Sequence, residues 1–328
     1  MRLKLTSATD GYKLGHHVDY PHLTQFILDN MTARGSRLAG FKKVVVWGTQ
    51  AMLIDLTEMA NDFFDTDEET VVEEFYKRNV AYVGQGPADV IGTDHIRALH
   101  RLGYLPLRFK SVPEGTRVPL RVPYILVENT LPEFFWLPNF FETFISTKMW
   151  APITSATIAH RYRQVFNEYC ALTGGNADLV QFQGHDFSMR GMSSIESGAA
   201  SGAAHLLSSM GTDTLTAIDY VEYYYPGDNG WVGASVHATE HSVMCAGGKE
   251  DELETYRRLL LAHPEGILSI VSDTWDLWHV ITVILPQLKD IIMARNGTLV
   301  IRPDSGDPER ILCGVSVAPP GSPGPTRG

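Results

Sequence analysis

One stretch of the chain, from Gly184 to Asp213, places two polar segments on either side of a run of very small residues. The first segment, 184–191, is typical of a strand end followed by a loop, and it carries an acid, a ring and a guanidinium. The run 193–207 is mostly Ser, Gly, Ala and Leu, which favours a helix packed closely on a sheet. The second segment, 211–214, opens another loop. Ligands of α/β folds bind beyond the carboxyl ends of strands, so these loops are a candidate site, and ordinary loop polarity is the alternative.

An alternation of short apolar segments with helical ones continues through the second half of the chain. Strand-like segments lie at 179–182, 268–271 and 298–301, and a long helical segment lies at 277–293. Because strands that alternate with helices form parallel sheets, this rhythm predicts a parallel sheet or a β/α barrel.

The first 150 residues have a more mixed pattern. Apolar periodicity predicts helices over 49–64, 68–82, 132–150 and 155–172, and strands over 26–28 and 44–47. Two extended runs flank Pro113-Glu114-Gly115, which predicts a hairpin within 106–130. The predicted fold class is therefore α/β, with an α+β N-terminal domain at 1–150 and a partial β/α barrel at 151–314.

The last segment, 315–328, has a different composition. It contains four prolines and three glycines with almost no apolar periodicity, which is typical of loops and disordered segments. A β/α barrel would need more strands after 298–301. We therefore expect either disorder in this segment or a point at which the chain is truncated.

Composition excludes several classes of function. The net charge of −11 argues against a general surface for nucleic acid or anionic membranes, although a local basic pocket stays possible. Cys170, Cys245 and Cys313 are far apart and form no CxxC pair, which fits a reducing compartment without a thiolate metal site. The first residues are too polar for a signal peptide and no apolar run reaches membrane length, so a cytoplasmic protein without a membrane partner is predicted.

Further polar groups gather near the ends of predicted strands. They lie in 9–13 with 34–37, in 235–242, in 271–276 and in 301–308. Each has a structural alternative, such as a helix cap or a plain turn. Together they supply arginines, carboxylates, histidines and aromatic rings, which suits a flat aromatic substrate and a phosphorylated, hydroxyl-rich one.

His237 and His241 stand four residues apart, the spacing of metal ligands on a helix. Ala238 occupies the position at which a zinc protease motif has its glutamate, and a third ligand is not evident. No metal site is predicted from the sequence, and neither a P-loop nor a nucleophile-elbow motif is present.

Six of these segments, in order between residue 9 and about 313, resemble nicotinamide phosphoribosyltransferase. They are Thr9-Asp10-Gly11-Tyr12-Lys13, His185-Asp186-Phe187-x-x-Arg190-Gly191, Gly211-Thr212-Asp213-Thr214, Glu240-His241-Ser242, Val271-Ser272-Asp273 and Ile301-Arg302-Pro303-Asp304-Ser305-Gly306. Ser188-Met189 departs from the family's more usual glycine followed by a large residue, and His237 stands where proline is usual. The resemblance implies a barrel of the type II phosphoribosyltransferase kind.

The resemblance also implies the reaction, in which nicotinamide and phosphoribosyl pyrophosphate give nicotinamide mononucleotide and pyrophosphate in NAD salvage. The pyridine nitrogen attacks the anomeric carbon as pyrophosphate leaves, so positioning and electrostatics would carry the catalysis. Phe187 would stack on one face of the ring, and Tyr12 of a second subunit on the other, which implies a homodimer with a shared active site. Asp213 would accept from the carboxamide and repel nicotinate.

The remaining site residues follow from the same resemblance. His241, Asp304 and Arg302 are the expected catalytic residues, and His241 resembles the histidine that ATP phosphorylates. Asp304 would hold ribose hydroxyls, and Mg²⁺ would accompany the pyrophosphate. The expected substrate-binding residues are Tyr12, Asp10, Arg34 at the 5′-phosphate, Phe187, Arg190 and Arg302 at the pyrophosphate, Asp213, Ser235, and Asp273 on the magnesium side.

Two alternatives stay open at this point. The chain could be a nicotinate phosphoribosyltransferase of the same fold, or a non-catalytic fragment that binds nicotinamide or a full-length partner. The resemblance further implies that the family continues past residue 314 with phosphate-binding loops. The chain alone is therefore expected to be incomplete and inactive.

Overall fold

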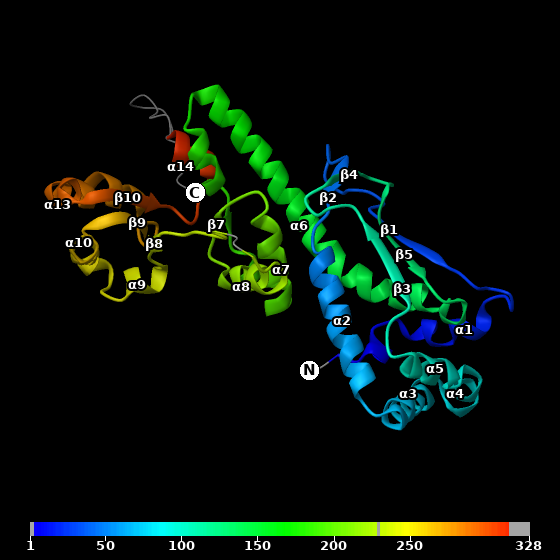
Figure 1. Cartoon of the computed structure of the whole chain (residues 1–328). Coiled ribbons are helices and arrows are strands. Elements are labelled where there is room, and N and C mark those ends of the chain that lie inside the picture. The colour runs from blue at the N-terminus through cyan, green and yellow to red at the C-terminus, as the bar shows by residue number, and fades with distance from the viewer. Residues whose placement is uncertain (1–2, 228–229, 315–328) are drawn as a thin grey trace, which may run out of the picture. The chain divides into compact units, whose positions relative to one another are not determined.

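The structure, a computed structural model, describes residues 3–227 and 230–314 (Figure 1). It divides into two compact units, one ending at Ala234 and the other starting at Ser235, and each is considered by itself. The predicted domain boundary at 150/151 falls within helix α6 (Leu137–Thr173) and stays a prediction. The predicted tail at 315–328 lies outside the described residues.

The first unit opens with short helices, an antiparallel sheet and a set of packed helices. Its elements up to residue 134 are η1 (Leu5–Ser7), η2 (Gly11–Gly15), α1 (His16–Asp19), β1 (Leu28–Thr32), β2 (Lys43–Val45), α2 (Thr49–Asp65), α3 (Glu68–Val83), α4 (Gln85–Ile91), α5 (Asp94–Leu102), β3 (Leu107–Ser111), β4 (Arg117–Pro119), β5 (Pro123–Asn129) and η3 (Pro132–Phe134). The helices predicted at 49–64 and 68–82 are confirmed.

The antiparallel pairing predicted within 106–130 is present, and further strands extend it. β3 pairs with β5, which also pairs with β1, whereas β4 pairs with β2 in a second sheet. The turn at 113–116 is held by β2, because Gly115 donates its N–H to the Val46 carbonyl (2.8 Å) and Val46 donates to the Thr116 carbonyl (3.0 Å). The two extended runs and the antiparallel pairing of β3 with β5 were therefore predicted correctly, whereas the further partners β1 and β2 lie earlier in the chain.

Helix α6 is continuous where two helices were predicted (Figure 1). Pro152 lies inside it and is buried, so the helix tolerates a missing backbone N–H because the proline packs in the interior. The amino-terminal half of α6 contributes a cluster of aromatic and aliphatic side chains to the large core of this unit, namely Leu137, Phe140, Phe141, Phe144, Ile145, Met149 and Ile153.

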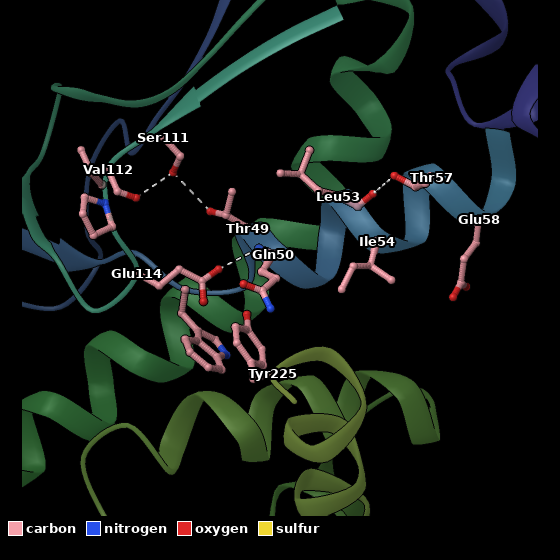
Figure 2. Close-up of a pocket in the computed structure, with 12 residues that line it drawn as sticks. Thr49, Gln50, Leu53, Ile54, Thr57, Glu58, Ser111, Val112, Glu114 and Tyr225 are labelled. Carbon is pink, nitrogen blue, oxygen red and sulfur yellow. Dashed lines mark hydrogen bonds between the residues drawn. The ribbon is translucent and has the colours of Figure 1, made fainter. Parts of the chain in front are cut away.

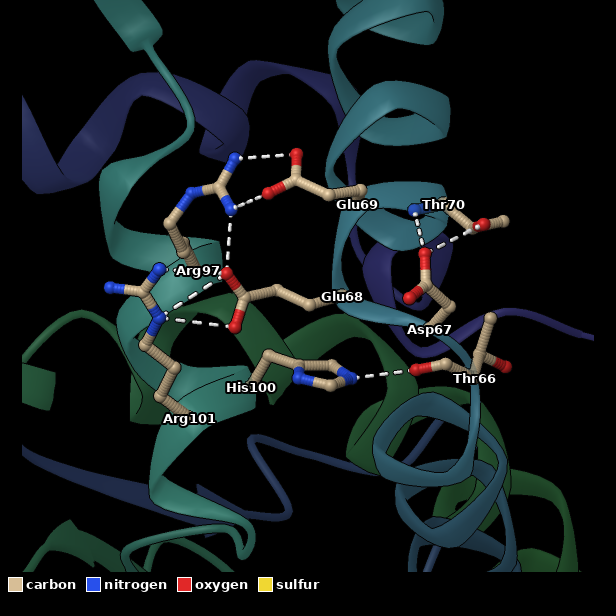
Figure 3. Close-up of polar contacts among 8 residues, drawn as sticks. All are labelled: Thr66, Asp67, Glu68, Glu69, Thr70, Arg97, His100 and Arg101. Atoms are coloured by element: carbon tan, nitrogen blue, oxygen red, sulfur yellow. Dashed lines mark hydrogen bonds and ion pairs between the residues drawn. The ribbon is translucent and has the colours of Figure 1, made fainter.

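Ion pairs link helices α3 and α5 on the surface (Figure 3). Glu68 accepts from Arg97 at 2.6 Å and from Arg101 at 3.0 Å, and Arg97 also pairs with Glu69. The hydrogen bonds from both arginines lower the pKa of Glu68. Because these side chains are exposed or half-exposed, the network adds local order to the helix pair and little to overall stability.

The end of the first unit contains the stretch from which the sequence analysis started. After α6 come η4 (Ala177–Phe182), β6 (His185–Asp186), η5 (Ser188–Gly191), α7 (Ile195–His205), β7 (Gly211–Thr212) and α8 (Leu215–Tyr224). β6 and β7 are parallel, as predicted. The segment 179–182 was predicted as a strand and is a 3-10 helix instead, which Asn176 caps by accepting from the Asp178 N–H (2.9 Å).

Glycines allow α7 to pack closely on these strand ends. A Cβ at Gly202 would lie 2.7 Å from the Ala217 Cβ and 3.0 Å from a carboxylate oxygen of Asp186. A Cβ at Gly198 would lie 2.8 Å from the Met189 Cα. Because real Cβ contacts are longer, the small residues in α7 are required by close packing, which confirms the interpretation of 193–207.

The second unit contains a parallel sheet whose order is β10-β9-β8. Its elements are β8 (His237–Ala238), α9 (His241–Cys245), η6 (Lys249–Asp251), α10 (Glu252–Ala262), β9 (Glu265–Val271), α11 (Leu277–His279), a π-helical turn η7 (Val280–Ile284), α12 (Leu285–Gln287), α13 (Lys289–Ala294), β10 (Asn296–Arg302) and α14 (Pro308–Cys313). The core includes Tyr256, Leu268 and Ile270. The predicted parallel strands 268–271 and 298–301 are confirmed as β9 and β10.

Candidate functional site

The loops that follow β6 and β7 form what we call the Phe187 corner, residues 185–191 and 211–214. It contains a cavity of about 610 Å³ lined by Phe187, Arg190 and Asp213, together with Met189 and Thr214. Phe187 is 50% exposed although it is a large aromatic residue. An exposed ring beside a cation and a carboxylate can bind a flat ligand that also has polar edges.

A histidine accompanies the carboxylate in the Phe187 corner. Nε2 of His185 lies 3.3 Å from Oδ1 of Asp213, and the His185 ring lies 5.1 Å from the Phe187 ring between centroids. The Asp213 side chain keeps 40% of its surface exposed. The corner therefore presents a ring and a carboxylate to solvent from two neighbouring parallel strands.

The second unit contains a similar arrangement, which we call the His241 corner, residues 239–241, 271–273 and 302–305. Nε2 of His241 lies 3.1 Å from Oδ1 of Asp273. The second oxygen of Asp273 accepts from the Asp304 backbone N–H (3.0 Å) and the Ser305 hydroxyl (2.5 Å). The loops after three parallel strands therefore converge on one carboxylate, whose side chain is only 8% exposed.

Burial and hydrogen bonding act on the Asp273 carboxyl in opposite directions. Burial alone would raise its pKa, but the hydrogen bonds from Ser305, His241 and the Asp304 backbone together hold the pKa below its ordinary value. Asp273 is therefore an anion at neutral pH. When the neutral His241 ring carries its proton on Nε2, facing Asp273, the Nδ1 atom keeps a lone pair that can act as a nucleophile or a base.

Arg302 is fixed by the backbone of this corner. Its Nη2 donates to the Thr239 carbonyl at 2.6 Å, and the Thr239 hydroxyl accepts from the Val271 N–H at 3.0 Å. Thr239 thus connects the loop after β8 to the end of β9 and holds a guanidinium at the same edge of the sheet. His237 lies in β8 and His241 begins α9, so the two do not share a helix face.

Several predicted site residues lie outside the segments that define the two corners. Tyr12 is 67% exposed in η2, and Asp10 accepts from the Thr143 hydroxyl at 2.6 Å. Arg34 lines a cavity of about 430 Å³ together with Asp29 and Glu142. Within the described residues, that cavity shares no lining residue with the Phe187 corner. Ser235 lies two residues before the start of β8.

Sequence reasoning gave no role to several residues that shape the two corners. They are His185, Asp186, Thr212, Thr239 and Ser305, each within two positions of a residue that was selected. The available signal was the polar character of a residue at a strand end, which alone does not reveal its partner.

A cavity of about 670 Å³ beside α2 was also not predicted (Figure 2). There the Trp47 and Tyr225 rings stack at 4.5 Å, and Glu114 accepts from the Gln50 N–H.

Comparison with known proteins places this geometry in a family. The sequence profile of the nicotinate phosphoribosyltransferase (NAPRTase) family matches residues 182–317. The nicotinamide phosphoribosyltransferase of Acinetobacter baylyi is 47% identical over 327 residues, which are 95% of this chain and 64% of that protein. The nicotinamide phosphoribosyltransferase of Mycoplasma pneumoniae is 34% identical over 95% of this chain and 68% of its own length. The chain belongs to the nicotinamide phosphoribosyltransferase family.

Solved structures of related enzymes show the same fold. Human nicotinic acid phosphoribosyltransferase superposes with a TM-score of 0.57 at 18% identity, covering 91% of this chain and 61% of that one. Nicotinate-nucleotide pyrophosphorylase from Pyrococcus furiosus gives 0.54 at 14% identity, covering 93% and 59%. The predicted fold class, of the type II phosphoribosyltransferase kind, is confirmed. The chain spans slightly less than two thirds of the Acinetobacter baylyi relative.

The described residues contain neither a helix suited to a membrane nor a cluster of metal-binding side chains. Among the described helices, none is both long enough and apolar enough to cross a bilayer. In the same part of the chain, His, Cys, Asp and Glu side chains do not gather in groups of three or more that could hold a metal ion.

Proposed function

We propose that this chain acts in the transfer of a phosphoribosyl group to nicotinamide, which yields nicotinamide mononucleotide and pyrophosphate for NAD salvage. The Phe187 corner carries the proposal, since it combines an exposed ring with an exposed carboxylate in a family whose matched relatives are named for nicotinamide. The first unit would bind the acceptor, and the second would act on phosphate groups.

Nicotinamide would bind with its ring on Phe187 and its carboxamide at Asp213. The NH₂ group would donate to the carboxylate, which the neighbouring His185 orients at 3.3 Å. The carboxylate of nicotinate would instead meet a like charge in a confined cavity, and this repulsion would favour the amide. Arg190, which lines the same cavity, would face the pyrophosphate.

The His241 corner would supply the ATP-dependent part of the reaction. With Nε2 donating to Asp273 at 3.1 Å, Nδ1 of His241 can attack the γ-phosphorus of ATP, so that a phosphohistidine forms and ADP leaves. Arg302, held by the Thr239 carbonyl, would stabilise charge on the phosphate oxygens, and the exposed Asp304 would bind ribose hydroxyls.

Magnesium would arrive with phosphoribosyl pyrophosphate and offset the charge of the leaving group. Both oxygens of Asp273 already accept hydrogen bonds, and its side chain is almost fully buried. This donor set does not fit a direct bond from Asp273 to the ion. The contacts favour a role for Asp273 in holding His241, and no step is assigned to the metal.

A second copy of the chain would complete the acceptor site. Tyr12 is 67% exposed, which suits an aromatic ring that stacks on a ligand held by a partner. The proposed homodimer would therefore place Tyr12 of one subunit opposite Phe187 of the other. Arg34 and Asp10 would join the phosphate side of this shared site, and Ser235 the acceptor side.

The proposal is tested by following product and binding separately. The chain is incubated with nicotinamide, phosphoribosyl pyrophosphate, Mg²⁺ and ATP, and nicotinamide mononucleotide is measured by liquid chromatography. Nicotinamide and nicotinate affinities are measured by calorimetry on the wild type, on Phe187→Ala and on Tyr104→Ala, whose ring is also 50% exposed. Loss of nicotinamide binding in Phe187→Ala alone would support the proposal.

Two results would reject it. Tighter binding of nicotinate than of nicotinamide by the wild-type chain would favour the acid-specific alternative. The names of the family profile and of the human structure refer to that acid. Binding of nicotinamide without any product would leave the non-catalytic alternative, in which the chain needs further sequence or a longer partner.

A further inference from the structure

We propose that Asp186 is a positioning residue for the nicotinamide site, and that it sets the affinity for nicotinamide without touching the ligand. This inference rests on the proposed function. Asp186 is the last residue of β6, immediately before Phe187, and it is 9% exposed. Its hydrogen bonds reach both loops of the Phe187 corner. Phe187 and Asp213, by contrast, each lie in only one of these loops, directly after β6 and β7.

The carboxylate holds the loop that carries Phe187. Oδ1 accepts from the backbone N–H of Ser188 at 3.2 Å, and Oδ2 lies 3.1 Å from the Ser188 hydroxyl. That hydroxyl also lies 3.2 Å from the Gly198 carbonyl, so its single proton can bond to the carboxylate or to α7. Since Ser188 directly follows Phe187, these bonds fix the backbone on both sides of the ring.

The same residue holds the loop that carries Asp213. The Asp186 carbonyl accepts from the Asp213 N–H at 2.9 Å, and Oδ2 is 3.5 Å from the Thr212 hydroxyl. The oxygen of that hydroxyl in turn accepts from the Thr214 N–H at 3.0 Å. Asp186 therefore couples the ring-stacking residue on one strand to the amide-binding carboxylate on the next.

The surroundings of Asp186 leave little room for rearrangement. A Cβ at Gly202 of α7 would lie 3.0 Å from an Asp186 oxygen, and the side chains of Thr212 and Thr214 are fully buried. A group held by several bonds in a close-packed environment keeps its geometry before the ligand arrives. Such preorganisation raises affinity because less ordering is required on binding.

The variant Asp186→Asn tests the inference at constant shape. Its NH₂ group would replace one acceptor oxygen and face the hydroxyls of Ser188 and Thr212, which lie 3.1 and 3.5 Å from that oxygen in the wild type. We expect the dissociation constant for nicotinamide to rise about tenfold, which corresponds to a loss of about 1.4 kcal/mol in binding free energy. Calorimetry on the full chain measures this change. The affinity for phosphoribosyl pyrophosphate is expected to stay within about twofold, because the coupled loops carry the ring and amide contacts.

A double-mutant cycle separates positioning from general damage to the fold. Thr212→Val removes the hydroxyl that meets Asp186, and it should weaken nicotinamide binding about threefold alone but hardly at all on top of Asp186→Asn. Thr212→Ser, which keeps the hydroxyl, should restore wild-type affinity. Glu252→Gln, a change at an acid that is 3% exposed in the second unit, is the matched control and should leave nicotinamide affinity unchanged.

Hydrogen exchange gives a readout that does not depend on ligand. In Asp186→Asn, exchange should accelerate in peptides covering 187–191 and 211–214, but not in peptides from α2. Wild-type nicotinamide affinity in Asp186→Asn, equal weakening of both substrates, or unchanged exchange at these peptides would each overturn the inference. A wild-type chain that does not bind nicotinamide at all would instead reject the proposed function, and the inference with it.

Discussion

The two corners contain the same pair of residue types in opposite states. In the Phe187 corner, His185 orients Asp213, and that carboxylate keeps 40% of its surface exposed. In the His241 corner, Asp273 is 8% exposed and accepts three hydrogen bonds, while the His241 side chain is 46% exposed. One pair leaves its acid exposed to solvent, and the other leaves its base exposed.

This difference shows that a His–Asp pair does not define a function by itself. Which member reacts depends on which one the surrounding backbone has already satisfied. Ser305 and the Asp304 N–H occupy the Asp273 carboxylate, so only the ring of His241 is left for chemistry.

The largest effect is expected for Asp273→Asn. The amide cannot stabilise a charged His241 ring and can present NH₂ to Nε2, which would favour the wrong tautomer. Formation of phosphohistidine from ATP should fall about 100-fold, whereas nicotinamide affinity should not change. Acid-labile ³²P bound to the protein measures phosphohistidine formation, and calorimetry measures nicotinamide affinity. Unchanged labelling would remove the proposed role of Asp273.

Acid should affect the two units at different pH values. Burial lowers the pKa of His95, in the first unit, from 6.5 to about 3, so only the unfolded chain takes up this proton below about pH 6.5. Stability of the first unit should therefore decrease as pH falls below about 6.5, by about 1.4 kcal/mol per pH unit. In the second unit, the lowered pKa of Asp273 contributes stability at neutral pH. That contribution is lost only below about pH 4, near the ordinary pKa of an Asp carboxyl.

Segment-resolved hydrogen exchange between pH 7 and pH 4, corrected for intrinsic rates, measures this difference. His95→Gln provides the control, because it removes the titrating ring and should flatten the dependence in the first unit. Equal loss of protection in α5 and β9 at pH 5 would contradict the prediction.

A smaller effect is expected for Asp213→Ser. Removal of the like charge should relax the discrimination against nicotinate, and the ratio of nicotinamide to nicotinate affinity should fall about tenfold, or about 1.4 kcal/mol. Parallel titrations with both ligands give the ratio. An unchanged ratio would mean that the preference is determined elsewhere in the site.

The smallest effect is expected for Arg97→Ala in the surface network of α3 and α5. Because exposed ion pairs contribute little, a small decrease in melting temperature is expected, with both corners unaffected. Thermal unfolding and nicotinamide titration provide the measurements. A loss of nicotinamide affinity in this variant would indicate coupling that the hydrogen bonds do not suggest.

Local patterns predicted the corners well because the relevant signals are close together in sequence. Small residues in α7 predicted its close packing, and the apolar runs at 268–271 and 298–301 predicted the strands of a parallel sheet. Long-range pairing was out of reach. The pairings of β1 with β5 and of β2 with β4 join residues that are far apart in the chain, and the contacts of Asp186 with Thr212 and Ser188 appear only in the folded structure.

The segment 132–172 illustrates the same limit within one element. Apolar periodicity predicted two helices, at 132–150 and 155–172, whereas the structure has a single helix, α6, that runs through both segments from residue 137. The roles given to Tyr12, Arg34 and Ser235 stay predictions, since they concern substrates or a second subunit.

Helix α6 restricts where residues can be inserted into the chain, because its two halves pack against different parts of the first unit. Its first half is embedded in the main core through Met149 and Ile153, while Ser155 bonds to Ser201 of α7 at 2.6 Å and Ala156 packs against α7. Each residue added to a helix rotates everything beyond it by about 100°. A single insertion between residues 153 and 155 would therefore turn Ser155 away from α7 while the core stayed in place. Insertions are expected in the loops that flank α6, and not within it.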